Sequence, residues 1–463
     1  MPTDADFELR QRLRRIATLG SVTALVGWDE QVMMPPGGTA FRADQTAMLA
    51  GMIHGQVTDP ALGDLIADAL DASAASPDSD AAAVAREAAR TRGRAVKLPA
   101  ALVEALSHTT VLAQSAWAEA RKANDFAGFA PWLEKVTDLK RQEAACLGAG
   151  GKPYDALLDE YEPGETTDSL TTLFDAMRPR LVTLLARIQG SGRQAPTEIL
   201  RREFDPVAQA ALAREAAIAI GFDAAAGRLD VSTHPFCSGI APGDTRITTR
   251  YAANDFAGGL LGTLHETGHA MYEQGLPKAE HFGTALGEAA SLGVHESQSR
   301  LWENFVGRSD AFWRFFWPRT RSAFASLSDV RREDFLFALN AVRPSYIRTE
   351  SDEVTYNLHV LLRFDIEQKL INGELAPRDV PAAWDALFAT LFGIDVPDAA
   401  SGCLQDVHWS CGLMGYFPTY TLGNMYAAQL FAAAGEALGD LDAHFARGEF
   451  APLLQWLRNH VHC

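Results

Sequence analysis

Apolar residues recur every three or four positions along most of the chain, which is the pattern of amphipathic helices. The pattern is clearest in five segments: Phe7–Ile16, Asp80–Ala95, Ala100–Lys122, Leu170–Ile188 and Pro206–Ile220. The stretch Asp71–Asp80 is small and polar, and it predicts a connection between two helices rather than a linker between domains. No internal repeat of fixed period interrupts this pattern.

Residues 228–251 depart from the helical pattern. Their sequence, RLDVSTHPFCSGIAPGDTRITTRY, is rich in β-branched residues, glycine and proline, and its DTRITTRY part alternates. Alternation of this kind predicts a short hairpin or a small sheet. The helical pattern resumes after Asn254 and continues to the end. The sequence therefore predicts a mainly α fold with one small β element.

Composition narrows the possible functions. Hydrophobic residues make up 47% of the chain and charged residues 22%, as in ordinary soluble globular proteins. The net charge of −18 argues against a nucleic-acid partner, because phosphate binding needs a basic face. No run of about 18 apolar residues predicts a membrane span, and the first residues do not resemble a signal peptide. The five cysteines are scattered without a CxxC pair, so we expect reduced thiols and a cytoplasmic protein.

The strongest chemical motif is HETGH at residues 265–269. Residues four apart lie on one face of a helix, so His265 and His269 can bind one metal ion. Glu266 lies about 100° further round the helix, where it can reach a metal-bound water. This is the pattern of the HExxH zinc peptidases. Alone it is suggestive, since a chain with 12 histidines would carry it by chance on the order of once in fifty.

A catalytic zinc ion usually has three protein ligands and one open position. The segment ALGEAASLGVHESQSRLWENF predicts a second helix downstream. Its candidates for the third ligand are Glu288, His295 and Glu296, and Glu296 lies 27 residues after His269. The residues alone leave this choice open.

A set of further motifs resembles the Taq-type thermostable metallocarboxypeptidase family. In order along the chain they are GWDEQVMMPPGG (27–38), YDALLDEYEPG (154–164), HPF (234–236), DTRIT (244–248), HETGH (265–269), HESQ (295–298), IRTESDEVT (347–355) and GCLQDVHW (402–409). The resemblance covers nearly the whole chain. Ser351 and Val354 depart from the family's usual Ala-Asp-Glu-Leu-Thr, which affects packing beside Arg348 rather than chemistry.

The resemblance implies a fold and an assembly. The fold would be a large helical body with a deep active-site groove and a small β element, similar to the neurolysin and angiotensin-converting-enzyme peptidases. Residues 1–463 would form a single domain, in which the helices of about 1–190 form one wall or lid of the groove and about 200–463 form the catalytic part. The family also implies a homodimer.

The resemblance further implies roles for particular residues. It selects Glu296 as the third metal ligand, and it makes Arg348 the residue that binds the C-terminal carboxylate of the substrate. It places His234 and Tyr420 beside the reacting carbonyl. Without it, Arg348 would be interpreted as an ion-pair partner of Glu350 or Asp352, with Arg343 as the alternative anchor.

Other roles rest on the residue types. Tyr420 can stabilise an oxyanion, with Tyr416 as its rival and His408 as a residue that could serve the same end. Arg246 alternates with Asp244 and Thr248 on one strand face, so it braces the strand and contributes some substrate contact. The histidines also need outer partners for their second ring nitrogens, and Asp352 and Glu353 are candidates that the sequence cannot place.

Together these features predict a carboxypeptidase of broad specificity. Zn²⁺, or Co²⁺ or Mn²⁺ in its place, would be held by His265, His269 and Glu296 and would activate a water molecule. Glu266 would take the proton and deliver it to the leaving amine. The substrate would be a peptide with a free C-terminus. An oligopeptidase or dipeptidyl carboxypeptidase on the same scaffold is the alternative, and a non-catalytic peptide-binding protein is disfavoured because no ligand type is missing.

Overall fold

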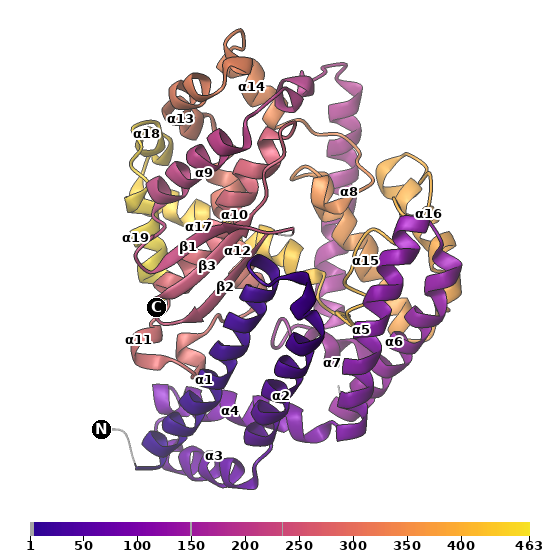
Figure 1. Ribbon diagram of the computed structural model, residues 1–463, viewed down its shortest axis with the longest axis vertical. Helices are drawn as coiled ribbons and strands as arrows, with labels where there is room; N and C mark the ends of the chain where they lie inside the picture. The colour runs from indigo at the N-terminus through magenta and orange to yellow at the C-terminus, as the bar shows by residue number, and fades with distance from the viewer. Residues whose placement is uncertain (1–3, 149–150, 234) are drawn as a thin grey trace.

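The structure is a computed structural model that describes residues 4–148, 151–233 and 235–463. Helices make up most of it, as predicted, and a small sheet interrupts them (Figure 1). The helices before the sheet are α1 (Asp4–Val32), α2 (Thr39–Val57), α3 (Pro60–Ser73), α4 (Asp80–Lys97), α5 (Ala100–Ala123), α6 (Phe126–Leu147), α7 (Pro153–Leu158), α8 (Thr167–Gly190) and α9 (Pro206–Ile220).

The first helix after the sheet contains the HETGH motif. The helices after the sheet are α10 (Phe256–Gly275), α11 (Lys278–His281), α12 (Leu292–Arg300), a π-helical turn η4 (Leu301–Val306), α13 (Asp310–Ala323), α14 (Arg332–Leu339), α15 (Thr355–Ile371), α16 (Val380–Phe392), α17 (Pro418–Leu438), α18 (Leu441–Ala446) and α19 (Ala451–His460). Two stretches between them, 340–354 and 393–417, contain no α-helix. The mainly α prediction is confirmed.

The five segments with the clearest helical pattern all lie within helices, and short polar side chains start several of them. Asp205 accepts a hydrogen bond from the main chain of Ala208, and Pro206 follows as the first residue of α9. Ser79 caps α4 in the same way. Helix α3 continues to Ser73, so the predicted loop after it is shorter than the sequence suggested.

The β element is a three-stranded sheet with β3 in the centre. Its strands are β1 (Gly227–Val231), β2 (Phe236–Ala241) and β3 (Asp244–Thr249), in the order β1-β3-β2. The hairpin or small sheet predicted for residues 228–251 is this sheet, in which β2 and β3 are antiparallel and β1 adds a parallel strand. Ile247 of β3 is buried against Ala217 of α9 and Ala270 of α10. The sheet therefore rests directly on the metal-motif helix.

Two large hydrophobic cores meet at α17. One core is formed by α9, α10, α13, α14 and the last helices, and it includes Ala427 of α17. The other includes Leu422 of α17 and joins α6–α8 to α15 and α16, so that the rings of Phe174 and Phe364 lie 5.0 Å apart. Helix α12 packs against both α10 and α17. It therefore lies at the boundary between the two cores.

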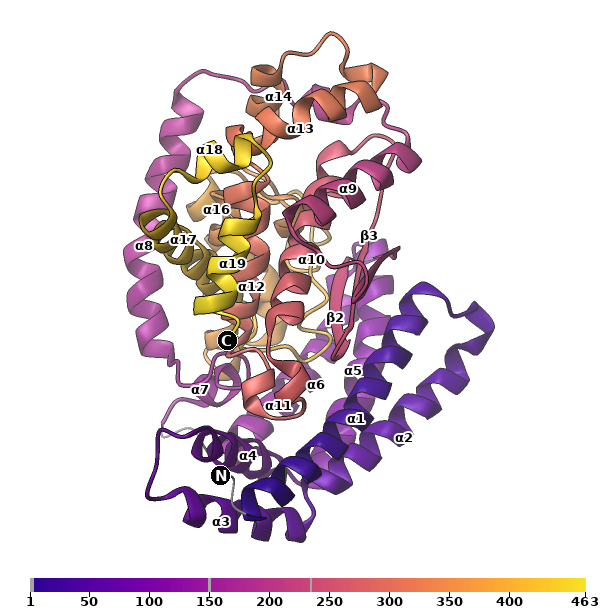
Figure 2. The ribbon, with the colours of Figure 1, turned by 90° about the vertical axis from the view of Figure 1, so that its left-hand side faces the viewer.

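Helices α1 and α2 form a hairpin at the N-terminal side. Figure 2 shows α2 on the outer side of α1, and α1 packs against β2. A small separate core, which includes Leu9, Leu62 and Val84, joins α1 to α3 and α4. None of the helices in the described ranges combines the length and apolar character that crossing a bilayer requires.

Candidate metal centre

Helix α10 presents the two histidines of the HETGH motif. Asp255 caps the helix by accepting a hydrogen bond from the main chain of Gly258. Leu264 and Met271 are fully buried and hold the helix in the first core. His265 and His269 are half-buried on one face, with ring centroids 4.9 Å apart. The helical spacing thus produces the arrangement that the sequence predicted.

Two glycines allow neighbouring helices to approach this face closely. A Cβ on Gly268 would lie 2.5 Å from the carbonyl oxygen of Gln298, so α10 and α12 could not pack this tightly with any other residue. A Cβ on Gly423 of α17 would lie 2.6 Å from Cγ of Glu296. Glu296 is therefore buried between α10 and α17.

The ligand atoms of His265, His269 and Glu296 converge. Oε2 of Glu296 lies 3.7 Å from Nε2 of His265 and 3.4 Å from Nε2 of His269, and the three ligand atoms lie within 4.8 Å of one another. Zinc ligands at about 2.0–2.2 Å in tetrahedral geometry are roughly 3.3–3.6 Å apart. Two imidazole nitrogens and one carboxylate in this arrangement fit a catalytic metal ion with an open fourth position.

Glu296 is suited to remain ionised. Burial opposes its charge, but Arg300 and His265 outweigh burial and hold its pKa well below the usual value. Arg300 donates from Nε to Oε1 of Glu296 at 2.7 Å, which leaves Oε2 facing the histidines. Glu288 lies elsewhere, beside a cavity of about 300 Å³ near His281. Of the three third-ligand candidates, the structure brings Glu296 to both histidines.

Each histidine of the candidate metal centre has an outer partner on Nδ1. Nδ1 of His265 lies 2.9 Å from Oε2 of Glu303, in the π-helical turn that continues α12. Nδ1 of His269 lies 3.1 Å from the carbonyl oxygen of His295 and 2.6 Å from Nδ1 of His295. A proton on each Nδ1 would satisfy these acceptors and leave both Nε2 lone pairs for a metal.

Further charges hold these outer partners. Nε2 of His295 lies 2.9 Å from Glu273, which also pairs with Lys278. Burial would raise the pKa of Glu273, but the hydrogen bond and charge of His295, together with Lys278, lower it to about 2. Burial likewise opposes the charge of Glu303, and Arg300 and His265 lower its pKa to about 2.

The structure places Glu303 and His295, rather than the candidates Asp352 and Glu353, against Nδ1 of the two histidines. Asp352 instead caps α15, where its Oδ1 accepts hydrogen bonds from the main chain of Val354 and Thr355, both at 3.0 Å. Asp352 caps the helix that begins three residues after it, and this contact is available without any distant part of the chain. Glu303 and His295 lie on the next helix, and the sequence offered a weak signal for Glu303. It follows Glu296 by seven residues, which places both on one helix face.

Glu266 is buried beside the metal-ligand set. Only 6% of its surface is exposed. Burial raises its pKa to about 7; the charge of His265 lowers the pKa, and the charge of Glu296 raises it. A carboxyl group with a pKa near neutrality is suited to accept and release a proton.

Arg348 lies in a second polar cluster and is already paired. Its guanidinium donates from Nη2 to Oδ1 of Asp406 at 2.8 Å and from Nη1 to the hydroxyl of Tyr356 at 2.8 Å. The ion-pair partner is therefore Asp406, and neither Glu350 nor Asp352 takes this role. Asp406 also pairs with Arg363 at 2.5 Å. Two arginines outweigh the burial of Asp406 and hold its pKa well below the usual value.

His408 and Tyr420 belong to the same cluster. Nε2 of His408 lies 3.2 Å from the hydroxyl of Tyr420, and the Arg348 guanidinium lies 4.8 Å from the centre of the Tyr420 ring. Burial lowers the pKa of His408 to about 3, so its ring is neutral at physiological pH. The rival Tyr416 contacts the Tyr420 ring at 5.4 Å. The structure thus brings together residues that are up to 72 positions apart in the sequence.

Arg300 and Tyr356 connect this cluster to the metal-ligand set. The Arg300 guanidinium, which binds Glu296, also lies 4.1 Å from the centre of the Tyr356 ring. The hydroxyl of Tyr356 in turn accepts the hydrogen bond from Arg348. A continuous buried path therefore leads from the third metal ligand to Arg348.

The remaining predicted contact residues lie near the sheet. His234 lies outside the described residues. Arg246 of β3 pairs with Asp244 at 2.8 Å, and its guanidinium lies 4.3 Å from the ring centre of Trp28 in α1. These contacts correspond to the bracing role that the sequence favoured.

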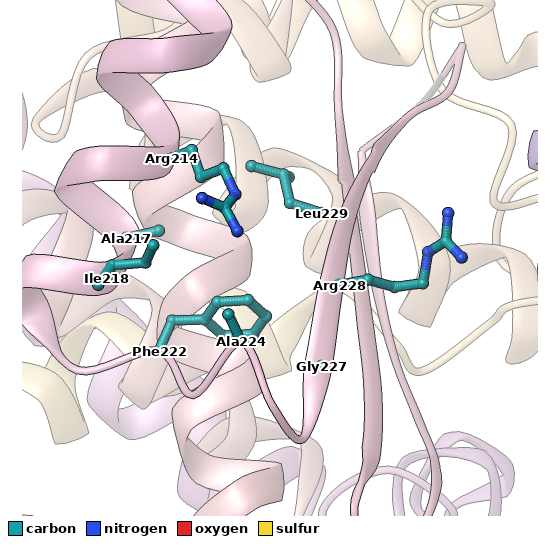
Figure 3. Close-up of a pocket in the computed structure, with 8 residues that line it drawn as sticks. All are labelled: Arg214, Ala217, Ile218, Phe222, Ala224, Gly227, Arg228 and Leu229. Atoms are coloured by element: carbon teal, nitrogen blue, oxygen red, sulfur yellow. The ribbon is translucent and has the colours of Figure 1, made fainter.

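A separate cavity of about 260 Å³ lies between α9 and β1. In Figure 3 the side chain of Arg214 points from α9 toward the strand, whereas Arg228 points away to the other face. The metal-ligand residues do not line this cavity. It is therefore distinct from the metal centre.

Comparison with known proteins agrees with the geometry. The family model described as carboxypeptidase Taq (M32) metallopeptidase matches residues 8–463. The chain belongs to the carboxypeptidase Taq (M32) family. It is accordingly a metallocarboxypeptidase, and the resemblance inferred from the motifs is confirmed.

Relatives of this M32 chain cover it almost completely. It is 49% identical to thermostable carboxypeptidase 1 of Thermus thermophilus, over 100% of this chain and 92% of that protein. Among solved structures, the M32 carboxypeptidase of Deinococcus radiodurans R1 is 40% identical, with a TM-score of 0.93, over 99% of this chain and 92% of that chain. A Pyrococcus furiosus carboxypeptidase, in a form titled Apo-Mg, is 35% identical with a TM-score of 0.95, over 100% and 93%.

Proposed function

We propose that this metallocarboxypeptidase uses zinc and removes single residues from the C-terminus of peptides with broad specificity. The observation that carries the proposal is the convergence of His265, His269 and Glu296, with the buried Glu266 beside them. His265, His269 and Glu296 would hold the ion, and Co²⁺ or Mn²⁺ could replace it, because similar ligand sets accept these ions. When bound, the ion would supply a Lewis acid and a water molecule of lowered pKa.

Glu266 acts as the general base in this proposal. It accepts a proton as water attacks the last peptide carbonyl and then delivers that proton to the leaving amine. Its pKa of about 7, raised by burial, supports both steps. Because Arg300, Glu303 and His295 bind the ligand residues, they hold the ligand set in place during these steps.

Tyr420 and His408 stabilise the oxyanion that forms on the carbonyl. The neutral ring of His408 has one N–H, and Tyr420 has one O–H, and the two groups lie 3.2 Å apart. A hydrogen-bond donor aimed at a developing oxyanion contributes about 3–4 kcal/mol to the transition state. In this arrangement one of the two groups donates to the other, so one donor is left for the oxyanion.

Arg348 binds the C-terminal carboxylate of the substrate. The guanidinium has five N–H groups, and its contacts with Asp406 and Tyr356 do not use all of them. Asp406 and Tyr356 therefore fix the plane of the guanidinium and leave it able to meet a planar carboxylate. His234 and Arg246 would contact the substrate near the sheet, Arg246 chiefly through the position of β3 relative to α1.

The proposal extends to organisation and location. The helices before about residue 190 would form one wall of a substrate groove, and the part from about residue 200 would form the catalytic body. The active form would be a homodimer, as the family resemblance implies. Large apolar side chains are exposed on α1 and α2, including Phe41 and Met48, and they offer a surface for such contact. Five free cysteines suit the cytoplasm.

Digestion of an unblocked peptide, with and without a chelator, tests this function. Mass spectrometry should show a ladder that shortens by one residue at a time, and the chelator should stop it. A peptide with an amidated C-terminus should remain intact, because Arg348 would lose its carboxylate partner. Release of dipeptides would favour the dipeptidyl carboxypeptidase alternative, and cleavage of the amidated peptide would favour an oligopeptidase.

A further inference from the structure

Glu367 is a fully buried acid that none of the steps above uses. It lies on α15, and three donors reach its two oxygens. Nε1 of Trp409 donates to Oε1 at 2.8 Å, while the hydroxyl of Tyr154 and the main-chain nitrogen of Gly415 donate to Oε2 at 2.7 and 3.0 Å. A carboxylate accepts all three bonds, whereas an amide or a protonated acid would direct a hydrogen at one of the donors.

Two of these donors belong to residues 402–417, which run between α16 and α17 without a helix or strand. This segment contains Asp406 and His408, and it leads directly into the first turn of α17, where Tyr420 lies. Trp409 is the neighbour of His408 in the chain. Without a ladder of main-chain hydrogen bonds, such a segment takes its position from side-chain anchors. Glu367 binds it at two points, Trp409 and Gly415.

The third donor, Tyr154, connects the segment 402–417 to α12, the helix that carries Glu296. Tyr154 is the first residue of the YDALLDEYEPG motif, and Glu162 lies near its other end. Glu162 accepts hydrogen bonds from the hydroxyl of Ser291 at 2.6 Å and from the main chain of Gly293 at 3.0 Å, at the start of α12. One short stretch of chain therefore contacts both Glu367 and the helix that carries Glu296.

We propose that Glu367 is a positioning residue for the reaction. Its carboxylate fixes residues 402–417, and with them His408 and the start of α17. Through Tyr154 and the motif that begins there, it also fixes their position relative to α12. The inference rests on the proposed roles of His408 and Tyr420. Burial raises the pKa of Glu367 to about 7 although its three donors lower it, so the ionised form that accepts all three bonds predominates above that pH.

The test compares Glu367→Gln with Asp365→Asn in the full-length, metal-loaded protein. Asp365 lies on the same helix, pairs with Arg178 of α8 at 2.9 Å and does not touch the segment. Glu367→Gln should lower kcat roughly 10- to 100-fold, because a displacement of about 1 Å can cost that much. Metal content should not change. Hydrogen–deuterium exchange of peptides from 402–417 should become faster, while that of α10 should not, and Asp365→Asn should leave kcat and this exchange unchanged.

A double-mutant cycle with Trp409→Phe gives a readout that a general loss of stability would not move. The amide that Glu367→Gln introduces is expected to place its NH₂ group against Nε1–H of Trp409, since the other orientation would oppose the main-chain N–H of Gly415. Trp409→Phe should therefore lower kcat by a smaller factor in the Glu367→Gln background than in the wild type. If Glu367→Gln does not fold, Tyr154→Phe removes a single donor and should show the same changes more weakly.

The possible outcomes separate this inference from the proposed function. Unchanged exchange of 402–417 in Glu367→Gln would overturn the anchoring by Glu367 and leave the roles of His408 and Tyr420 standing. Faster exchange with unchanged kcat would overturn the positioning role and also count against those two residues. Additive effects of Glu367→Gln and Trp409→Phe would contradict the contact on which the inference depends.

Discussion

The three candidate metal ligands come from two regular helices, whereas the centre of the Arg348 cluster comes from stretches without an α-helix and only its outer members Tyr356, Arg363 and Tyr420 lie on helices. His265 and His269 are one helical turn apart on α10, and Glu296 lies on α12, which packs against it. Arg348, Asp406 and His408 lie in the two irregular stretches 340–354 and 393–417. In the first region the backbone fixes the geometry. In the Arg348 cluster, ion pairs between buried charged side chains fix the geometry, and each of these side chains has partners far away in the sequence.

This difference predicts how the two regions fail. A change in the metal region should affect chemistry or metal binding while the fold survives, because the helices are held by their own cores. A change in the Arg348 cluster should affect stability, because its charges balance one another inside the protein. Four variants, taken from the largest expected effect to the smallest, can confirm or contradict this contrast.

Glu266→Gln should produce the largest effect, a loss of turnover of roughly 10³- to 10⁴-fold, since it removes the proposed general base and keeps its shape. Metal content, measured by atomic absorption, and thermal stability should remain close to those of the wild type. Substantial activity in this variant would refute the assignment of Glu266.

Asp406→Asn should lower the free energy of unfolding by about 3–5 kcal/mol, because it leaves Arg348 and Arg363 buried without their shared counter-charge. Urea denaturation measures this effect. The exposed Asp379, which lies 3.9 Å from Arg378, provides the control, and Asp379→Asn should change stability little. Equal stability of the two variants would show that the cluster is not held by charge.

Glu303→Gln should weaken metal binding about 10- to 100-fold, because it removes the charge that orients His265. Competition with a chelating dye measures the affinity. Glu353→Gln is the matched control, since the sequence pointed to Glu353 and the structure points to Glu303. A larger loss from Glu353→Gln would reverse that conclusion.

The smallest effect concerns His462, whose Nε2 lies 3.1 Å from the side-chain oxygen of Gln298 on α12. Burial, and then Arg458, lowers its pKa from 6.5 to about 3. The unfolded chain therefore takes up this proton first, so the stability that His462 contributes is complete above pH 6.5 and is lost as the pH falls toward 3.

Between pH 7.5 and 5 the wild type should lose about 1–2 kcal/mol through His462. His462→Gln keeps a hydrogen-bond donor but does not titrate, so its free energy of unfolding should change less over the same range. Parallel pH profiles for the two proteins, measured by urea denaturation, would exclude this contribution.

Patterns of neighbouring residues predicted the helices and strands, because contacts between residues close in the sequence stabilise these elements. Apolar spacing located α9 at the bounds that the structure has, and the composition and alternation of residues 228–251 located the small sheet. Asp352, which the sequence offered only as a candidate outer partner of the histidines, is a helix cap in the structure. The sequence showed Asp406 only as one residue of the motif GCLQDVHW, because its role depends on Arg348 and Arg363, 58 and 43 residues away.

The sequence by itself determined that His265 and His269 share one face of a helix, because one turn of helix places residues four apart on one face. Its ordered motifs also determined the family. Only the tertiary structure decided which groups surround these residues. The close approach of α10, α12 and α17 at Gly268 and Gly423 brings Glu296 to the histidines, and the packing of α7 against α15 brings Tyr154 to Glu367. Contacts of this kind join distant parts of the chain, and burial gives them their strength.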